Sequence, residues 1–266
     1  MALALMLAGC AGGRDQRLSE AQAIAGAGGL VPRWLHARGM TILGFERAGP
    51  PGGVLTVYLE GDGRAWLNPW QPSTDPTPTD PVGLRLAAGD GSRPVLYLAR
   101  PCQFTTSAGC GARLWTSERL SPEIVAIYQQ LLDDVLHRTG STKLALIGYS
   151  GGGALATLLA ERRHDVALLV TVAADLDLEE WTRLRQLAPL SGSLDPADDA
   201  AAIDRLRQVH FAGADDDVVP AGVAQAFLRR LGKGSDARLV VVPHFDHGCC
   251  WAASWPQLLR EMQHPE

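Results

Sequence analysis

The sequence predicts an α/β domain with a mostly parallel central sheet, flanking helices and a small cap insertion. Short apolar runs typical of buried strands alternate with segments whose apolar residues recur at helical spacing. One run, at 143–149, ends in Gly148-Tyr149-Ser150-Gly151-Gly152 and continues as a helical pattern. A chain of 266 residues, 46% of them hydrophobic, is long and apolar enough to bury the core of one such domain.

Composition and charge argue against two kinds of partner. The formal net charge is -5 at pH 7 and the sequence has no lysine or arginine cluster, so nucleic acid is not expected to bind. No stretch of the sequence reaches the roughly 18 apolar residues that a membrane-spanning helix needs. The remaining membrane question concerns the N-terminus.

The N-terminus carries a candidate lipid-attachment signal. An apolar run closes on Leu7-Ala8-Gly9-Cys10, which resembles a bacterial lipobox. The resemblance implies that residues 1–10 are a lipoprotein signal and that Cys10 is lipidated, so the membrane is contacted through a lipid anchor alone. Ala11 is compatible with sorting to the outer membrane, which predicts a place in the bacterial cell envelope, at the periplasmic face. The alternative is an apolar tail, since no basic segment precedes the run.

The segment after the lipobox is predicted to connect the anchor to the domain. Residues 11–33 are expected to form a tether with a short helix at 14–27, which glycines bring to an end. The domain is expected over 34–266. Its first two strands are predicted at 34–40 and 42–48, as antiparallel neighbours.

A proline-rich loop is predicted from Arg64 to Asp80, and it carries Trp66 and Trp70. Long ordered loops at a sheet edge are usually functional. The two tryptophans are expected either to wall a substrate pocket or to anchor the loop onto the core. Further along, a long amphipathic helix is predicted at 118–138, with Ser117 or Ser121 as its N-cap.

The cysteines fit an oxidising compartment. Without Cys10 an even set of four remains, and four cysteines allow three pairings. We favour a local disulfide between Cys102 and Cys110, which leaves Cys249 and Cys250 as a vicinal disulfide or as free thiols. Because the sequence has no C-x-x-C pair and no matching histidine spacing, a zinc site is not expected.

The glycine-bracketed serine has the local chemistry of a cramped turn. A serine held there needs small neighbours, because a β-carbon on either side would clash. The turn lifts the Ser150 hydroxyl off the sheet edge, and the helix at 153–163 starts beside it. The amide of Gly151 is then free to bind an oxyanion.

This strand, turn and helix resemble the nucleophile elbow of the α/β-hydrolase superfamily, and the resemblance covers the chain from about residue 54 to the C-terminus. It implies a triad in the order serine, acid, histidine, beginning with Ser150. It also implies that the segment at 176–208 inserts as a cap that excludes water and selects the substrate.

The acid and the base are sought in loops that follow later strands. Residues 213–220 resemble the superfamily's acid loop, G-x-x-D-x-x-V-P, whose spacing selects Asp216. In the loop after the last strand, His247 with a glycine behind it fits the base better than His244. The alternatives for the acid are Asp215, Asp217, Asp175 and Asp177.

The resemblance further implies a second oxyanion amide in the loop after the strand at 54–59. Here that loop reads Glu60-Gly61-Asp62-Gly63, and Gly61 or Asp62 is expected to join Gly151 as a donor. The carboxylates of Glu60 and Asp62 would oppose a developing oxyanion unless they point away or meet a cation.

The resemblance therefore implies a serine hydrolase that cleaves carboxylic esters, carboxylesterase-like or lipase-like, through an acyl-enzyme intermediate and without a cofactor. The expected ligand is a small-molecule or acyl substrate, and the expected state is a monomer. An amidase or peptidase would use the same triad. A rival of another class is a non-catalytic envelope lipoprotein that keeps the fold in order to bind a ligand or partner.

Overall fold

The computed structural model describes residues 8–263, with side chains from Gly13 to Met262. Most of the predicted lipoprotein signal at 1–10 lies outside these residues, and so does the side chain of Cys10. Lipidation of Cys10 thus stays a prediction. None of the described helices is both long enough and apolar enough to cross a membrane.

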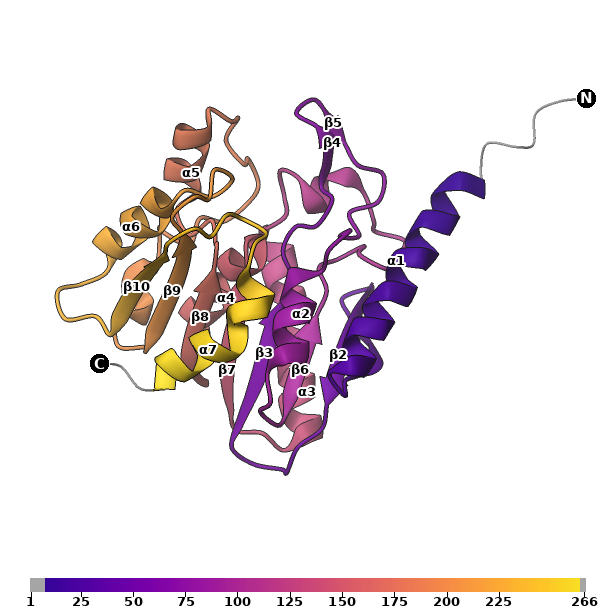
Figure 1. The fold of residues 1–266 in the computed structure, drawn as a ribbon, viewed down its shortest axis with the longest axis horizontal. Coiled ribbons are helices and arrows are strands. Elements are labelled where there is room, and N and C mark those ends of the chain that lie inside the picture. Colours follow the sequence, from indigo (N-terminus) through magenta and orange to yellow (C-terminus); the bar gives the residue numbers. More distant parts are fainter. Residues whose placement is uncertain (1–7, 264–266) are drawn as a thin grey trace, which may run out of the picture.

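The core of the molecule is an eight-stranded sheet with the order β1-β2-β6-β3-β7-β8-β9-β10 (Figure 1). The first two strands pair antiparallel, β2 pairs antiparallel with β6, and all other neighbours are parallel. The strands are β1 (Val31–Ala37), β2 (Met40–Arg47), β3 (Val54–Leu59), β6 (Val95–Leu98), β7 (Lys143–Tyr149), β8 (Val166–Val172), β9 (Gln208–Gly213) and β10 (Ala237–Val242). The antiparallel start was predicted correctly, but β1 begins before residue 34.

Helices cover both faces of the sheet. On one face, α3 (Pro122–Thr139), α4 (Gly151–Glu161) and α6 (Ala221–Arg230) pack against strand residues such as Leu55 and Val57. On the other face, α1 (Ala8–Ala27), α2 (Val82–Gly89) and α7 (Trp251–Gln263) pack against residues such as Tyr58. Successive strand residues point to opposite faces, which is why one apolar strand serves both halves of the core.

Helix α1 corrects the prediction of a tether over 11–33. It runs for 20 residues and buries Ala21 and Ala25 completely. Gly28 follows it in close contact with α2, since a β-carbon there would lie 2.6 Å from Ala88 Cα. Arg14 Nε lies 3.3 Å from Asp75 Oδ2, which adds a side-chain contact to the body of the domain. The segment is part of the folded unit.

Helix α3 shows how the sequence fixes an element's ends. Ser121 is the N-cap, as one of the two predicted candidates, and its hydroxyl accepts a hydrogen bond from the Ile124 amide at 3.4 Å. Pro122 occupies the first turn, where a missing N–H costs nothing. The helix ends at Gly140, whose φ of 68° is left-handed.

The predicted proline-rich loop contains a small antiparallel hairpin of β4 (Trp66–Asn68) and β5 (Gln71–Pro72). Trp66 is 47% exposed and Trp70 is 91% exposed. Neither ring anchors the loop onto the core, so that alternative was wrong. The loop is held instead by Ser73 and Thr77, which are buried and hydrogen-bonded around Asp75.

The segment at 176–208 lies between β8 and β9 and contains α5 (Leu178–Arg185) and a short 3-10 turn (Ala200–Ile203). Figure 1 shows α5 and the β4–β5 hairpin projecting from the same end of the sheet. The Asp195 carboxylate accepts hydrogen bonds from the Leu178 and Ala197 amides, at 3.1 and 3.0 Å, which ties the segment together.

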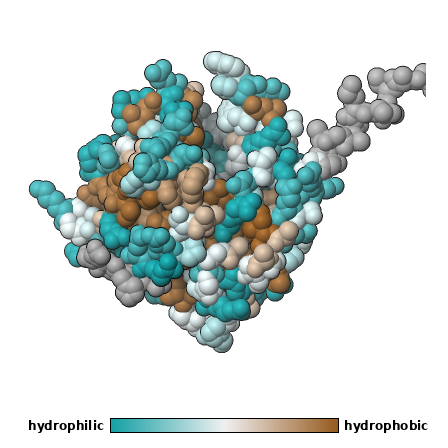
Figure 2. Space-filling model, viewed as in Figure 1, coloured by the Kyte–Doolittle hydropathy of each residue, from teal (hydrophilic) through white to brown (hydrophobic). Residues whose placement is uncertain are grey.

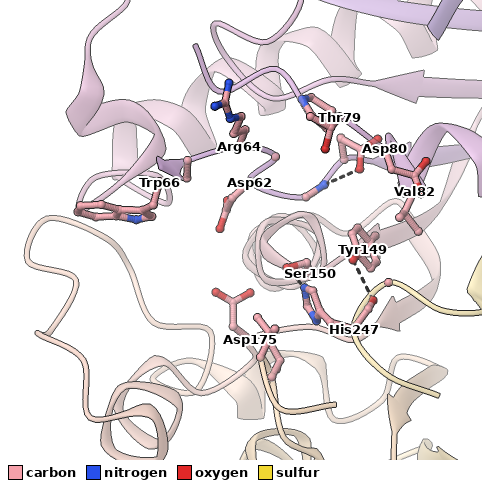
Figure 3. A pocket seen from close by; sticks show the side chains of 18 of the residues that line it. Asp62, Arg64, Trp66, Thr79, Asp80, Val82, Tyr149, Ser150, Asp175 and His247 are labelled. Atoms are coloured by element: carbon pink, nitrogen blue, oxygen red, sulfur yellow. Dashed lines mark hydrogen bonds between the residues drawn. The ribbon is translucent and has the colours of Figure 1, made fainter. Parts of the chain in front are cut away.

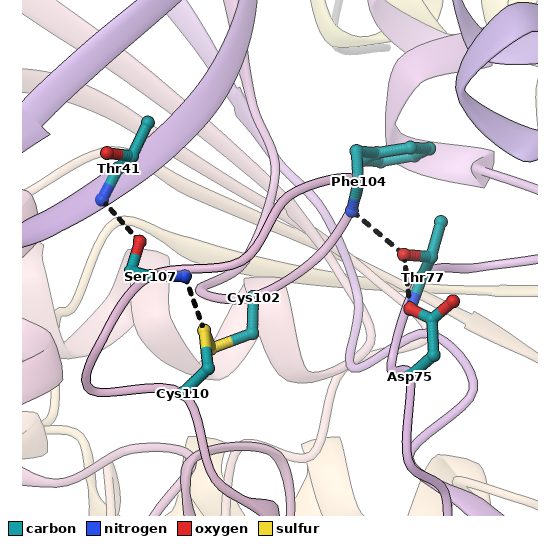
Figure 4. Close-up of a disulfide and its surroundings, with 7 residues drawn as sticks. All are labelled: Thr41, Asp75, Thr77, Cys102, Phe104, Ser107 and Cys110. Carbon is teal, nitrogen blue, oxygen red and sulfur yellow. Dashed lines mark hydrogen bonds between the residues drawn. A yellow bond between two sulfur atoms is a disulfide. The ribbon is translucent and has the colours of Figure 1, made fainter. Parts of the chain in front are cut away.

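A disulfide joins Cys102 to Cys110, whose Cα atoms are 5.8 Å apart (Figure 4). The loop that it closes is held to β2, since the Thr41 amide donates to Ser107 Oγ at 3.0 Å. Cys249 and Cys250 are consecutive residues whose Cα atoms are 3.1 Å apart.

Candidate active site

The turn between β7 and α4 holds Ser150 in a strained conformation, with φ 50° and ψ -128°. Its glycines allow this. A β-carbon on Gly148 would lie 2.5 Å from Gly153 Cα, and one on Gly152 would lie 2.8 Å from the carbonyl carbon of Glu60. The turn at 148–152 is thus packed against the backbone of the loop that begins at Glu60. The Ser150 hydroxyl lies at the carboxyl end of the parallel strands.

Three predicted residues from three strand ends meet at this edge. His247 Nε2 lies 3.1 Å from Ser150 Oγ, and His247 Nδ1 lies 2.9 Å from Asp216 Oδ2. Ser150 follows β7, Asp216 follows β9 and His247 follows β10. Because all three strands are parallel, the loops that carry these side chains lie at one end of the sheet (Figure 3 shows Ser150 and His247).

Asp216 is fixed by its own turn. Its Oδ1 accepts hydrogen bonds from the amides of Val218, at 2.9 Å, and Val219, at 2.8 Å, which leaves Oδ2 for the histidine. Its side chain is fully buried. A buried carboxylate with both oxygens hydrogen-bonded is well suited to orient an imidazole.

The alternatives for the acid lie elsewhere. Asp215 is exposed, and its Oδ2 lies 3.9 Å from His244 Nδ1, away from His247. Asp177 caps α5, where its Oδ1 accepts from the Glu180 amide at 2.9 Å. Asp175 pairs with Arg119, their Oδ2 and Nη2 atoms being 2.6 Å apart. Asp217 has no hydrogen bond to His247 among the described residues.

Two rings hold the histidine loop from behind. The Tyr149 hydroxyl donates to the carbonyl oxygen of His247 at 2.9 Å, and Trp251 Nε1 donates to the same oxygen at 3.1 Å. The Asp246 carboxylate accepts from the amides of Gly248 and Cys249, at 2.9 and 2.7 Å. His247 is therefore positioned by hydrogen bonds to its backbone carbonyl oxygen as well as by the contact of its ring with Asp216.

One of the two predicted amides of the β3 loop is already occupied. The Gly61 N–H donates to Glu60 Oε1 at 2.9 Å, so the prediction of Gly61 as an oxyanion donor was wrong. Within the described residues the Asp62 amide makes no hydrogen bond. Gly151 begins α4, and amides of a first helical turn have no partner inside the helix. Gly151 and Asp62 therefore keep free amides beside Ser150.

Glu60 points away from the serine, which answers one of the two electrostatic objections. Its carboxylate is fully buried and accepts from the amides of Gly83 and Leu84, at 3.0 and 3.2 Å, and from the Tyr97 hydroxyl at 3.1 Å. Burial raises the pKa of Glu60, while these donors lower it. The side chain serves as the cap of α2.

Asp62 meets two cations, which answers the other objection. Its Oδ1 lies 3.1 Å from Arg100 Nη1, and its Oδ2 lies 2.8 Å from Arg119 Nε. Gln103, from the disulfide loop, donates to the Gly61 carbonyl oxygen at 2.9 Å and so fixes the backbone just before Asp62. The loop after β3 is thereby held on both sides.

The serine opens into a cavity of about 540 Å³. Figure 2 shows the molecular surface hollowed between the projection that carries α5 and the one that carries the hairpin. Trp66 from the hairpin, Trp181 from α5 and Val218 from the acid loop supply apolar wall. Trp181 Nε1 donates to the Val218 carbonyl oxygen at 2.8 Å, which joins the inserted segment to the acid loop.

Among the described residues, no group of three or more histidine, cysteine, aspartate or glutamate side chains could hold a metal ion. The residues brought together at the carboxyl edge instead have the arrangement needed for nucleophilic attack by a hydroxyl on a carbonyl group.

Comparisons with known proteins support the fold. No family model matches the chain, and no curated protein matches it in sequence. Among solved structures, an esterase of Pyrococcus furiosus superposes with a TM-score of 0.63 at 12% identity, covering 88% of this chain and 90% of that one. An α/β-hydrolase of a Penicillium species gives 0.62 at 11% identity, with 88% and 96% covered. A bacterial membrane phospholipase A gives 0.58 at 15% identity, with 94% and 92% covered. The chain therefore has the fold of the α/β-hydrolases, which confirms the predicted fold class.

Sequence reasoning missed the side chains that support the site. Tyr149 occupies the variable position of the elbow motif, where the sequence pattern assigns no role. Arg100 and Arg119 stand in a loop and before a helix, with no motif around them. Their roles depend on contacts across the fold, so no local pattern could have identified them.

Proposed function

We propose that the chain is a serine hydrolase of carboxylic esters, with Ser150 as nucleophile, His247 as base and Asp216 as the orienting acid. The observation that supports this most directly is the unbroken series of contacts from Ser150 Oγ through the imidazole to the Asp216 carboxylate. His247 takes the hydroxyl proton as Ser150 attacks, and returns it to the leaving alcohol. Water then releases the acid from the acyl-enzyme by the same steps.

Gly151 and Asp62 supply the oxyanion hole in this proposal. Both amides are free, and both belong to backbone packed beside Ser150. Loss of one such donor typically lowers kcat by about 10²–10³. The negative charge of the tetrahedral intermediate is stabilised by groups that are in place before the reaction begins.

Esters are preferred over amides as substrates. The apolar wall formed by Trp66, Trp181 and Val218 suits an acyl chain or an aromatic group. Two of the structural neighbours are named as an esterase and a phospholipase, which supports carboxylesterase-like or lipase-like chemistry without identifying the substrate. Matched p-nitrophenyl ester and p-nitroanilide substrates with the same acyl group separate esterase from amidase activity.

The test of the mechanism is covalent labelling. A fluorophosphonate should add once to the native protein, as seen by intact mass, because only a serine activated by its base reacts. Ser150→Ala and His247→Ala should abolish both the adduct and ester turnover. A folded native protein that neither labels nor hydrolyses esters would contradict the proposal and favour a non-catalytic binding role.

We also propose that Cys10 is lipidated and anchors the protein at the periplasmic face of the outer membrane. The support is the lipobox-like sequence before it. Full-length protein expressed in bacteria with a radiolabelled or alkyne fatty acid should acquire the label, and Cys10→Ser should not. Equal labelling of the two would contradict lipidation at this position.

A further inference from the structure

A carboxylate sits against the backbone of the nucleophile elbow. A β-carbon built on Gly151 would lie 2.6 Å from both Cγ and Oδ2 of Asp62. The Asp62 carboxylate therefore occupies the space beside the first residue of α4, next to Ser150 (Figure 3). A negative charge at that place is unfavourable for any reaction that builds an oxyanion on the same helix end.

Each oxygen of the Asp62 carboxylate is paired with a different buried guanidinium group. Arg100 Nη1 lies 3.1 Å from Oδ1, and Arg119 Nε lies 2.8 Å from Oδ2. The two arginines are themselves connected, because Arg100 Nη2 donates to the backbone carbonyl oxygen of Arg119. Both side chains are less than a tenth exposed.

The far side of Arg119 is fixed as well. Its Nη2 lies 2.6 Å from Oδ2 of Asp175, and its guanidinium carbon lies 4.9 Å from the centre of the Trp181 ring. Burial raises the pKa of Asp175, and the charge of Arg119 lowers it. Two carboxylates thus face two guanidinium groups, and the set as a whole is neutral.

Stability alone does not account for this arrangement. Burial of ion pairs costs desolvation energy that their attraction does not reliably recover, so apolar residues of similar volume would serve a core as well. Asp62, Arg119 and Asp175 lie in the wall of the cavity that holds Ser150, and Asp62 is also the residue whose amide has no hydrogen bond among the described residues. Their position indicates a role in the reaction.

We propose that Arg119, together with Arg100, is a positioning residue that holds and neutralises the Asp62 carboxylate so that the Asp62 amide can stabilise the oxyanion. The inference rests on the proposed function. Without Arg119 the amide would be less well placed, and part of the carboxylate charge would act against the transition state.

The test is a double-mutant cycle of Asp62→Asn with Arg119→Gln, measured as kcat and KM for a p-nitrophenyl ester. Arg119→Gln in the native background should lower kcat roughly 10- to 100-fold with little change in KM, because the interaction is made in the transition state. In the Asp62→Asn background the same substitution should lower kcat less than about threefold. The unpaired Asp175 is common to both backgrounds, so its effect cancels from the comparison.

Three further variants separate positioning from folding. Arg119→Lys keeps the charge and should recover part of the lost kcat. Arg163→Gln is the matched control. The Arg163 side chain is 9% exposed and also pairs with two aspartates, Asp165 at 2.6 Å and Asp133 at 2.7 Å, and it does not line the cavity. This substitution should lower the melting temperature and leave kcat unchanged. If Arg119→Gln does not fold, Arg100→Gln replaces it in the cycle.

Equal losses of kcat from Arg119→Gln in both backgrounds would overturn the inference, because the arginine would then act independently of the Asp62 charge. That result differs from failure of the proposed function, in which the native protein itself neither labels with fluorophosphonate nor hydrolyses esters.

Discussion

The hydroxyl of Tyr149 donates a hydrogen bond to the backbone carbonyl oxygen of His247 across 2.9 Å, and the two rings lie 5.4 Å apart between centroids. One residue precedes the serine and the other is the histidine that faces it. The contact connects the elbow to the loop after β10, two segments that are far apart in the sequence.

Tyr149→Phe should therefore lower kcat by less than tenfold. A hydrogen bond between neutral groups contributes about 0.5–1.5 kcal/mol net, and the His247 carbonyl keeps its second donor, Trp251 Nε1. Steady-state hydrolysis of an activated ester measures the effect. A loss beyond a hundredfold would mean that the tyrosine hydroxyl takes part in the reaction directly.

Asp216→Asn should lower kcat by about 10⁴ while the protein stays folded, because an amide cannot hold the histidine tautomer that accepts the serine proton. Asp215→Asn is the matched control, since Asp215 is exposed and lies next to Asp216 in the sequence. It should keep native kcat. If the two variants lost activity equally, the identity of the acid would be wrong.

Gly152→Ala should lower the free energy of unfolding by about 2 kcal/mol or more. A β-carbon there would lie 2.8 Å from the carbonyl carbon of Glu60, and backbone cannot easily move aside. Gly26→Ala, in α1, should instead raise stability by up to about 1 kcal/mol, because a β-carbon there meets no heavy atom within 4 Å. Denaturant unfolding of both variants checks the contrast, and similar effects from the two would contradict it.

Glu161→Gln should stabilise the protein at pH 8 and much less at pH 5. Burial raises the pKa of Glu161 to about 8, although Arg162 Nη1 lies 2.8 Å from Oε2 and lowers it. Between its unfolded value of 4.5 and about 8, the folded state holds the proton more tightly than the unfolded state, so stability falls as pH rises. Glutamine removes this penalty, which amounts to up to about 4 kcal/mol at pH 8.

Melting temperatures at the two pH values test this prediction. Glu179→Gln is the control, since its side chain is 85% exposed. A shift of the same size at both pH values in Glu161→Gln would show that the carboxylate ionises normally in the folded state.

Trp66→Ala should raise KM for a long-chain acyl ester roughly fivefold and for an acetyl ester much less, because the ring supplies apolar wall to the cavity. Trp34→Ala, on the edge strand β1, removes a ring of similar exposure that does not line the cavity. It should not change either KM. Equal effects on the two esters would show that Trp66 does not contact the acyl chain.

The fold could be predicted from the sequence because its signals are local. Apolar runs such as 143–149 define strands, and the glycines around Ser150 admit only a tight turn. Ser150, Asp216 and His247 could be predicted from their order in the chain. They follow three parallel strands, and parallel strands bring such loops to one edge of the sheet.

The features that the sequence did not predict depend on contacts between side chains that are distant in the sequence. Gly61 was proposed as a donor because of its place in the loop after β3, yet the Glu60 carboxylate turns back onto its amide. The helix at 14–27 was predicted as a short element between tether and domain, but Ala21 and Ala25 pack closely onto the domain. The pairing of Asp62 with Arg100 and Arg119 has no sequence pattern at all.

The packing of α1 limits how the domain can move relative to any group attached at the start of this helix. A helix of 20 residues extends roughly 30 Å, and its second half packs onto the domain through Ala21 and Ala25. Because the helix is continuous and packed at one end, it acts as a rigid spacer. A group attached near its first turn would keep a fixed distance and direction from the opening of the cavity. If Cys10 carries a lipid as proposed, the cavity would be held at a nearly constant height and orientation above the membrane surface.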